Sequence, residues 1–236
     1  MPPSSLSTTT APLPSSPQTA AFPTTHLLQS AGIAIFHLST ARVVLCRHPS
    51  NPRYFLPKGR KNASEPITTT AVREGYEESG YRCRLLSLPL PHVQTLGEGP
   101  DPRFVVEPVW TQLLPVADEV QYLLFWFVGE TLDAEEEGRC NAQGDGWVLP
   151  MGWRGGMTVV ERREMDREGD GWREPVCHPD TGVDGDEMLY EKFLVPVEEA
   201  IRLLKGGVMT DVVRKGWAAI RLRAEMEEKD WEDEGR

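Results

Sequence analysis

The sequence predicts an α/β or α+β sandwich, and three observations support this fold class. Short segments rich in β-branched and aromatic residues recur between residues 31 and 131, which is typical of strands. Residues 66–79 carry start and stop signals of a helix, and two more helical segments follow residue 196. A mixture of several strands with a few helices packs as layers around one core.

The predicted elements follow one another along the chain in a regular order. The helix at 66–79 has Pro66 at its first position and Gly80 as its stop. Later helices are expected at 197–207 and from residue 210 onward, with an apolar face that includes Trp217. Strands are expected at 31–38, 42–48, 53–57, 81–90, 104–113, 120–131 and 187–196.

The domain organisation is predicted from length and composition. The 236 residues suffice for one well-buried domain with tails and an insertion. Residues 1–25, rich in Ser, Thr and Pro, are expected to be a disordered tail, since they bury too little apolar surface to offset ordering entropy. A single domain is expected over 26–225. It is interrupted at about 133–186 by a mostly flexible insertion with a short hairpin around 147–160, and 226–236 form a charged C-terminal tail.

The charge and cysteine content exclude several classes of protein. The formal net charge is −11, and an acidic chain is a poor candidate for general nucleic-acid binding. The four cysteines form no C-x-x-C pair, so free thiols in a reducing compartment are expected. No apolar run approaches the roughly 20 residues of a membrane helix, and no Lys or Arg precedes Arg42 to form a signal peptide. We therefore expect a cytoplasmic protein, with a nuclear location left open, that is neither secreted nor membrane-spanning.

The helix at 66–79 concentrates negative charge on one face. Glu74, Glu77 and Glu78 stand at i, i+3 and i+4 and share one arc of the helical wheel. Like charges at this spacing repel, so the arrangement favours a bound cation. Oxygen ligands of this kind suit Mg²⁺ or Mn²⁺ rather than zinc. The opposite flank is small or apolar, includes Gly75, and is expected to face the sheet.

A basic loop precedes this acidic helix. No Asp or Glu occurs before Glu65, whereas residues 58–61 hold Lys58, Arg60 and Lys61. Such a cluster can attract a compact polyanion, although a solvated loop is the alternative interpretation. A metal site beside a basic loop is typical of displacement at phosphorus.

The combined pattern resembles the Nudix box. The family spacing is met by Gly59, Glu65, Arg73-Glu74, Glu77-Glu78, Gly80 and Tyr81. This resemblance covers about a tenth of the chain directly. It implies an α/β/α sandwich with a mixed central sheet over roughly 26–130 and 187–225. Gly75, where the family prefers an apolar residue, and the insertion depart from the family pattern.

The resemblance also implies roles for individual residues. The reaction would be attack of water on a phosphorus of a diphosphate linked to another group. Glu65 would support the junction between loop and helix. The general base stays open, with Glu77 first and Glu187 and Glu191 as alternatives. The implied catalytic residues are Glu77, Arg73, Glu74 and Glu78, and the implied ligands of Mg²⁺ or Mn²⁺ are Glu74, Glu77, Glu78 and the Gly59 carbonyl.

The substrate is less well defined by the sequence. The segment "LPKG", residues 56–59, resembles that of hydrolases of diadenosine polyphosphates and of diphosphoinositol polyphosphates. We predict a dinucleoside polyphosphate such as diadenosine tetraphosphate, with a diphosphoinositol polyphosphate as the alternative. ADP-ribose, NADH and mRNA caps stay open, as does a non-catalytic nucleotide- or protein-binding module. The predicted substrate-binding residues are Lys58, Arg60, Lys61, Arg47 and Arg53, the last two being exposed strand-end residues in the alternative interpretation.

Overall fold

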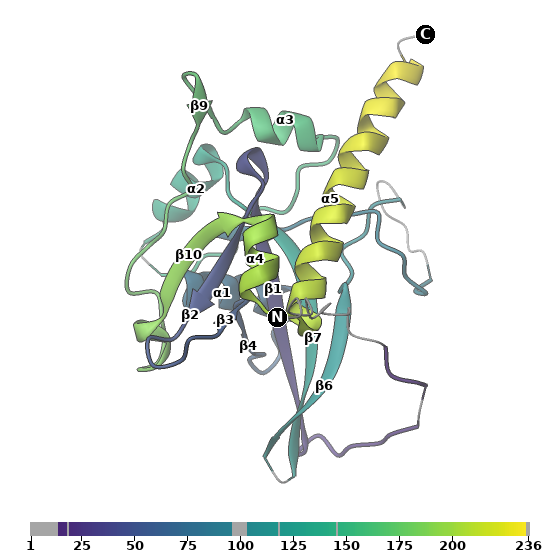
Figure 1. Cartoon of the computed structure of the whole chain (residues 1–236), viewed down its shortest axis with the longest axis vertical. Coiled ribbons are helices and arrows are strands. Elements are labelled where there is room, and N and C mark those ends of the chain that lie inside the picture. The colour runs from purple at the N-terminus through teal and green to yellow at the C-terminus, as the bar shows by residue number, and fades with distance from the viewer. Residues whose placement is uncertain (1–13, 18, 96–102, 118, 145, 235–236) are drawn as a thin grey trace, which may run out of the picture.

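A computed structural model describes residues 14–17, 19–95, 103–117, 119–144 and 146–234. A mixed β-sheet lies at its centre, with α1 (Ile67–Ser79) behind it and α4 (Val197–Leu203) and α5 (Gly207–Glu234) in front (Figure 1). The shorter helices are α2 (Ala134–Asn141), α3 (Val159–Glu164) and the 3₁₀ helices η1 (Leu38–Thr40) and η2 (Glu187–Leu189).

The central sheet has the strand order β10-β2-β1-β7-β5, with β3 added on β2, β4 on β1 and β6 on β7. The β1–β7 pair is parallel and the other pairs are antiparallel, which confirms the expected mixed sheet. The strands are β1 (Leu27–His37), β2 (Arg42–Arg47), β3 (Tyr54–Phe55), β4 (Lys58–Arg60), β5 (Cys83–Leu85), β6 (Trp110–Ala117), β7 (Val120–Thr131) and β10 (Glu191–Pro196).

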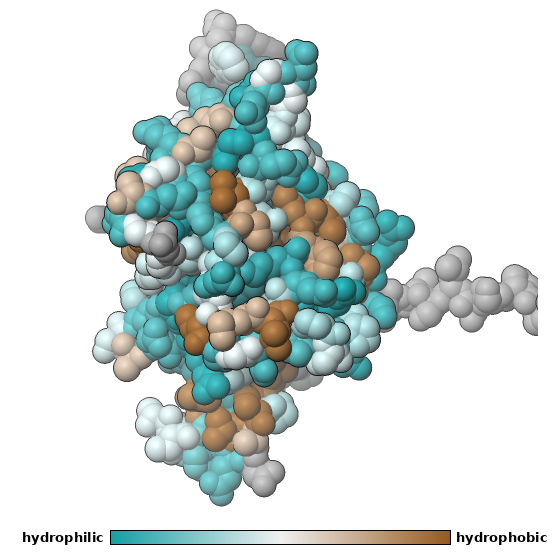
Figure 2. Space-filling model, turned by 90° about the vertical axis from the view of Figure 1, so that its left-hand side faces the viewer, coloured by the Kyte–Doolittle hydropathy of each residue, from teal (hydrophilic) through white to brown (hydrophobic). Residues whose placement is uncertain are grey.

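Two apolar cores cover the two faces of this sheet. Because side chains alternate along a strand, Ile33 and Ile35 of β1 pack on the side of α1, whereas Ala34 and Phe36 pack with residues of α4 and α5. The expected α/β/α sandwich is therefore confirmed. On the outer surface, hydrophobic side chains gather in small groups among hydrophilic ones (Figure 2).

Helix α1 is positioned by its two ends and by a small residue in its middle. Pro66 is extended, with φ −63° and ψ 142°, so the helix begins at Ile67 and not at Pro66 as predicted. Gly80 ends it with φ 72°, and its N–H donates to the Tyr76 carbonyl. A Cβ at Gly75 would lie 2.9 Å from Cys83 Sγ and 3.0 Å from Ile33 Cγ2. The departure from the family pattern thus lets the helix approach the sheet closely.

Several strands are shorter than the sequence predicted. The segment 81–90 keeps only β5, and β6 begins at Trp110 rather than at residue 104. Pro108, which has no N–H to donate to a neighbouring strand, lies just before the start of β6. Residues 187–189 form η2 before β10, where one continuous strand was expected.

The insertion at 133–186 contains regular elements where the sequence predicted mostly flexible chain. Its described residues place a hairpin of β8 (Arg167–Glu168) and β9 (Gly171–Trp172) beyond α3, so the hairpin predicted around 147–160 was wrong. Helix α3 starts with a capping box, in which Thr158 and Glu161 satisfy each other's backbone N–H groups. The T-x-x-E spacing of this box was a local signal that the sequence-based prediction missed.

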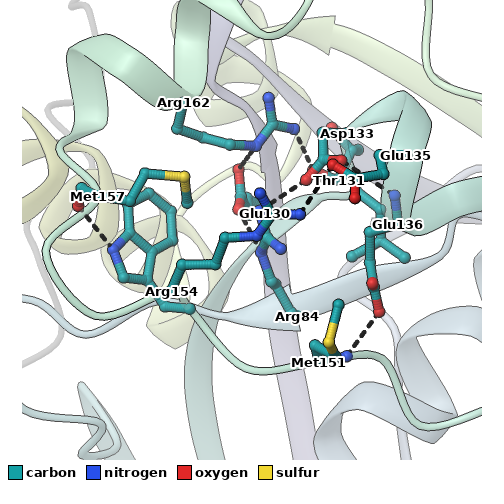
Figure 3. A network of polar contacts seen from close by, with 12 residues as sticks. Arg84, Glu130, Thr131, Asp133, Glu135, Glu136, Met151, Arg154, Met157 and Arg162 are labelled. Carbon is teal, nitrogen blue, oxygen red and sulfur yellow. Dashed lines mark hydrogen bonds and ion pairs between the residues drawn. The ribbon is translucent and has the colours of Figure 1, made fainter.

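Buried ion pairs attach the insertion to the sheet (Figure 3). Arg162 of α3 is fully buried, with Nε 2.8 Å from Glu130 Oε2 and Nη1 2.9 Å from Asp166 Oδ2. Arg84 of β5 lies 2.7 Å from the other Glu130 oxygen and 3.1 Å from Asp133 Oδ2. These contacts hold α3 against the ends of β5 and β7.

The two ends of the chain complete the description. Residues 1–13 of the predicted tail lie outside the described residues, and 14–17 and 19–25 form no helix or strand and are exposed. At the other end, α5 continues to Glu234, so most of the predicted charged tail is helical. Neither α5 nor any other helix of the described residues has the apolar stretch that a bilayer crossing requires. The four cysteines are free thiols, as expected.

Candidate active site

The site is built on the junction of β4 and α1. Strand β4 pairs with β1, opposite Ser30, Ala31 and Gly32, so the basic loop is anchored to the central sheet. A Cβ at Gly59 would overlap the Glu74 carboxylate. Only glycine therefore lets this strand lie so close to the acidic face of the helix.

Arg73 organises the carboxylates around it. Its Nη1 donates to Glu74 Oε1 at 2.7 Å and to Glu77 Oε2 at 2.6 Å. Its Nε donates to Glu65 Oε1 at 2.9 Å, and its Nη2 donates to the Arg60 carbonyl at 2.8 Å. The guanidinium thus fixes the loop and the helix to each other.

Glu65 lies at the start of this helix, and its place agrees with the expected supporting role. Besides its bonds to Arg73, its Oε2 accepts from the backbone N–H of Asn62 at 3.0 Å and from the Thr70 hydroxyl at 2.8 Å. Burial alone would raise the pKa of Glu65, but the bonds from Arg73, Asn62 and Thr70 outweigh burial and lower this pKa to about 2. Glu65 is therefore an ionised anchor of the loop.

Three carboxylates meet beside this unit. Oxygen atoms of Glu74, Glu78 and Glu187 lie within 4.8 Å of one another. Burial, which outweighs the nearby Arg73 and Lys58, raises the pKa of Glu74 to about 7 and that of Glu78 to about 8. Hard oxygen donors at this separation fit a divalent cation such as Mg²⁺ or Mn²⁺, which would stabilise their ionised forms.

Glu77 occupies a different place from the other two box glutamates. Its carboxylate is held by Arg73 and does not belong to the close group of Glu74, Glu78 and Glu187. Burial raises the pKa of Glu77. Its predicted role as a metal ligand stays a prediction, as does that of the Gly59 carbonyl.

The predicted basic residues divide into two groups. The backbone N–H of Lys58 donates to Glu78 Oε2 at 2.8 Å, while Lys61 Nζ donates to the Asn62 carbonyl at 3.1 Å. Arg60 and Arg53 are exposed. Arg47 is half-buried, pairs with Glu191 at 2.7 Å, and lies over the Tyr54 and Phe193 rings. The positive charge of Arg47 is therefore paired with a carboxylate of the protein. The loop, in contrast, carries the positive charges of Lys58, Arg60 and Lys61 beside the site.

The position of Glu187 in the site was not predicted from the sequence. It lies at the start of η2, directly after the insertion, and was predicted only as an alternative general base. Its Oε2 accepts from the Val183 N–H at 2.9 Å. No local spacing links it to the helix at 67–79, so the sequence held no signal for its place among the other carboxylates.

Comparison with known proteins agrees with this geometry. The family model described as NUDIX domain matches residues 27–152, which is more than half of the chain. The chain therefore belongs to the Nudix family and is a Nudix-type pyrophosphohydrolase. Hydrolases of this family generally use divalent metal ions. Comparison with curated protein sequences gives no match.

Solved structures similar to this chain are also Nudix proteins. A NUDIX hydrolase from Nitrosomonas europaea is 12% identical, with a TM-score of 0.44, over 81% of this chain and 88% of that one. A NUDIX family hydrolase from Clostridium perfringens is 11% identical, with 0.41, over 82% and 96%. A C. elegans Ap4A hydrolase is 14% identical, with 0.40, over 81% and 96%. Likenesses this distant carry no argument about substrate.

Proposed function

We propose that this protein hydrolyses a diphosphate linkage in a nucleotide-type substrate with the help of Mg²⁺ or Mn²⁺. The observation that carries the proposal is the meeting of Glu74, Glu78 and Glu187 oxygens within 4.8 Å of one another. Buried carboxylates repel one another unless a cation lies between them. The basic loop at 58–61 stands directly beside them and would attract phosphates.

Each group in the site has a proposed task. Glu74, Glu78 and Glu187 would hold the metal, which when bound would stabilise negative charge on phosphate oxygens. Arg73 orients Glu74 and Glu77 through bonds of 2.7 and 2.6 Å. The oxygen of a water molecule forms a bond to phosphorus, the bridging P–O bond breaks, and a water proton passes to a carboxylate.

Glu77 is the proposed acceptor of that proton. Of the two alternatives, Glu187 lies with the proposed metal ligands, and Glu191 lies outside the helix that carries the box glutamates. Both Glu77 and Glu191 pair with an arginine, so this pairing does not decide between them. Glu77 lies on the same helix face as the ligands without belonging to their close group. This position, near the proposed metal ligands but outside their group, supports the proposal.

The proposed substrate is a dinucleoside polyphosphate, with a diphosphoinositol polyphosphate as the alternative. Both carry many phosphates, which suits the cations of the loop, Lys58, Arg60 and Lys61. Arg53 is exposed and is kept as a proposed contact. The ion pair of Arg47 with Glu191 reduces the charge that Arg47 offers, so its predicted contact is proposed only as a secondary one.

The central experiment is a substrate panel with Mg²⁺, Mn²⁺ or chelator. We expect metal-dependent release of the phosphorylated products, which for a dinucleoside polyphosphate are two nucleotides. This release should fall by about 100-fold or more in Glu78→Gln, since even groups behind the ligands contribute 10- to 100-fold. The matched control is Glu198→Gln, which changes an exposed carboxylate on α4. Release that survives both chelation and Glu78→Gln would overturn the proposed function. Metal binding without turnover of any substrate would favour the non-catalytic module.

A second comparison tests the substrate class. Lys58→Ala and Arg60→Ala remove charge from the loop while keeping its backbone bonds. Turnover of diadenosine tetraphosphate and of diphosphoinositol polyphosphates should fall more than turnover of ADP-ribose, which has fewer phosphates. An equal fall for all three substrates contradicts the polyphosphate proposal.

A further inference from the structure

The segment from Cys177 to Glu187, which we name the strap, covers the C-terminal end of α1. The last carbonyls of a helix lack partners within the helix, and the strap provides several. The Thr181 hydroxyl donates to the Glu77 carbonyl at 2.9 Å, and Cys177 Sγ lies 3.7 Å from the Ser79 carbonyl. The backbone N–H of His178 donates to the Gly80 carbonyl at 2.8 Å. The strap is therefore bonded to the helix that carries the box glutamates.

The strap, which ends the insertion, is also tied to α2, which begins it. His178 Nε2 donates to Glu137 Oε1 at 2.6 Å, and Glu137 is buried on α2. Arg82 Nε lies 3.7 Å from the same carboxylate oxygen. The His178 ring stands edge-on to the Tyr76 ring of α1 at 5.7 Å. One side chain, His178, thus joins the strap, α2 and α1.

Residues 182–184 of the strap fix the position of the Glu187 side chain. A Cβ at Gly182 would lie 2.6 Å from the Met188 backbone nitrogen, so the strap packs directly against η2. The N–H of Val183 donates to Glu187 Oε2, and Asp184 Oδ1 accepts from the Glu187 N–H, both at 2.9 Å. The position of the Glu187 carboxylate therefore depends on where the strap is held.

We propose that His178 and Glu137 are positioning residues whose bond holds the strap so that Glu187 can bind metal together with Glu74 and Glu78. The Nudix box supplies two of the three close carboxylates, those of Glu74 and Glu78. The strap supplies the third, that of Glu187, and so completes the proposed metal site. Among the described residues, neither His178 nor Glu137 belongs to the close group of Glu74, Glu78 and Glu187. The inference rests on the proposed function, because it needs Glu187 to be a ligand.

The test measures binding of Mn²⁺ alone, by the electron paramagnetic resonance signal of the free ion. Four proteins form a cycle: wild type, His178→Ala, Glu187→Gln and the double variant. We expect His178→Ala to weaken Mn²⁺ binding by about 10-fold, as for other groups behind metal ligands. The double variant should bind as weakly as Glu187→Gln and no weaker, because the two changes act through one carboxylate.

Further variants separate positioning from stability. His178→Gln keeps a side-chain N–H and should recover part of the lost affinity. Thr181→Val removes one bond to α1 and should weaken binding in the same direction but by less than His178→Ala. The control is Glu174→Gln, which removes an exposed carboxylate of the insertion that lies 2.6 Å from Arg42 and should bind Mn²⁺ as wild type does. Circular dichroism confirms that each variant is folded.

The outcomes are distinct for the two proposals. Wild-type affinity in His178→Ala, or an equal weakening by His178→Ala with and without Glu187, overturns the positioning role. Wild-type affinity in Glu187→Gln does so too, since the strap would then deliver no ligand. If Glu78→Gln also binds Mn²⁺ as wild type does, the proposed metal site fails as well.

Discussion

Two arginine–carboxylate clusters of this protein differ in their balance of charge. In the first, which we name the insertion cluster, each carboxylate is within 3.4 Å of at least one arginine nitrogen. Three cations thus face three carboxylates, and all of these residues except Arg173, which is partly exposed, are buried. The insertion cluster consists of Arg84, Arg162, Arg173, Glu130, Asp133 and Asp166.

The second cluster, at the candidate active site, is short of cations. We name it the box cluster. Its arginine, Arg73, serves three carboxylates, and Lys58 approaches through its backbone and its charge. Two cations thus face five anions. The box cluster consists of Arg73, Lys58, Glu65, Glu74, Glu77, Glu78 and Glu187.

The pKa shifts follow this difference only in part, since burial raises the pKa of Glu130 in the insertion cluster, and the bonds of Glu65 outweigh burial and lower its pKa in the box cluster. Although burial opposes it, hydrogen bonds and nearby arginines lower the pKa of Asp133 and of Asp166 in the insertion cluster. In the box cluster, burial prevails and raises the pKa of Glu74 and of Glu78. When buried carboxylates outnumber the cations around them, their negative charges repel one another. An added cation would then stabilise the cluster. The box cluster, with fewer cations than carboxyl groups, is therefore the one that we expect an added cation to stabilise.

The largest effect is expected from Arg162→Met in the insertion cluster. This change leaves Asp166 and Glu130 buried with less compensation, and should lower the free energy of unfolding by about 3–5 kcal/mol. Urea unfolding measures it. The control Arg167→Met removes an exposed ion pair with Glu164 and should cost less than about 1 kcal/mol. A loss below 1 kcal/mol for Arg162→Met as well would show that the insertion cluster does not hold the fold.

The second largest effect is the stabilisation of the protein by Mn²⁺, which should depend on the box cluster and not on the insertion cluster. Mn²⁺ at 100 times its dissociation constant should stabilise the wild type by about 2.7 kcal/mol. Glu78→Gln should lose this increment, yet be at least as stable as wild type without metal, because it removes one of several repelling carboxylates. Arg162→Met should keep the increment in full. Thermal unfolding with Mn²⁺ or chelator measures both, and a metal-free Glu78→Gln much less stable than wild type would contradict the idea of excess charge.

The sequence predicted contacts between residues that are close together along the chain. It did not predict contacts between residues that are far apart along the chain. Glu74, Glu77 and Glu78 are local, and helical spacing places them on one face with no knowledge of the fold. Arg73 and Glu65 are equally local, and their bonds are as expected. The helix, the central strands and the acidic face were therefore predicted from the sequence.

The insertion cluster and Glu187 depend on contacts between distant segments. The burial of Arg162 is compensated by Glu130 of β7, which also pairs with Arg84 of β5, and by Asp166. A polar composition favours exposure, and a charged segment therefore resembles a solvated loop until its partners are known. Glu187 reaches the site through the strap, whose path over α1 is set by tertiary contacts.

Acidification should act in opposite directions on Asp166 of the insertion cluster and on Glu74 and Glu78 of the box cluster. Asp166 has a pKa below its usual range, because bonds from His37, Ser39 and Arg162 outweigh burial. Its contribution to stability is therefore present above the unfolded pKa of about 3.9, and is lost as pH falls through the lower folded value. A single titrating carboxyl group changes the free energy of unfolding by at most about 1.4 kcal/mol per pH unit. Glu74 and Glu78, whose pKa values are raised, have the opposite sign in metal-free protein.

Urea unfolding of the metal-free protein between pH 8 and 3 tests this contrast. Asp166→Asn should be less stable than wild type at pH 7 and should lose less stability below pH 4. Glu78→Gln should change less with pH than wild type between pH 8 and 5, where the protonation of Glu78 stabilises the metal-free fold. Parallel curves for all three proteins would contradict the assignment of opposite signs.

The smallest effect concerns the sheet-facing side of α1, opposite the box cluster. Gly75→Ala gains about 1 kcal/mol of helix propensity, but its Cβ would lie 2.9 Å from Cys83 Sγ, and crowding of this kind costs about 1–3 kcal/mol. We expect a net loss of about 1 kcal/mol, with Mn²⁺ affinity unchanged because this flank carries no ligand. In a Cys83→Ala background the loss should shrink, since the sulfur is gone. A stabilising Gly75→Ala would show that the sheet can yield there, and altered Mn²⁺ affinity would show that the two flanks of the helix are coupled.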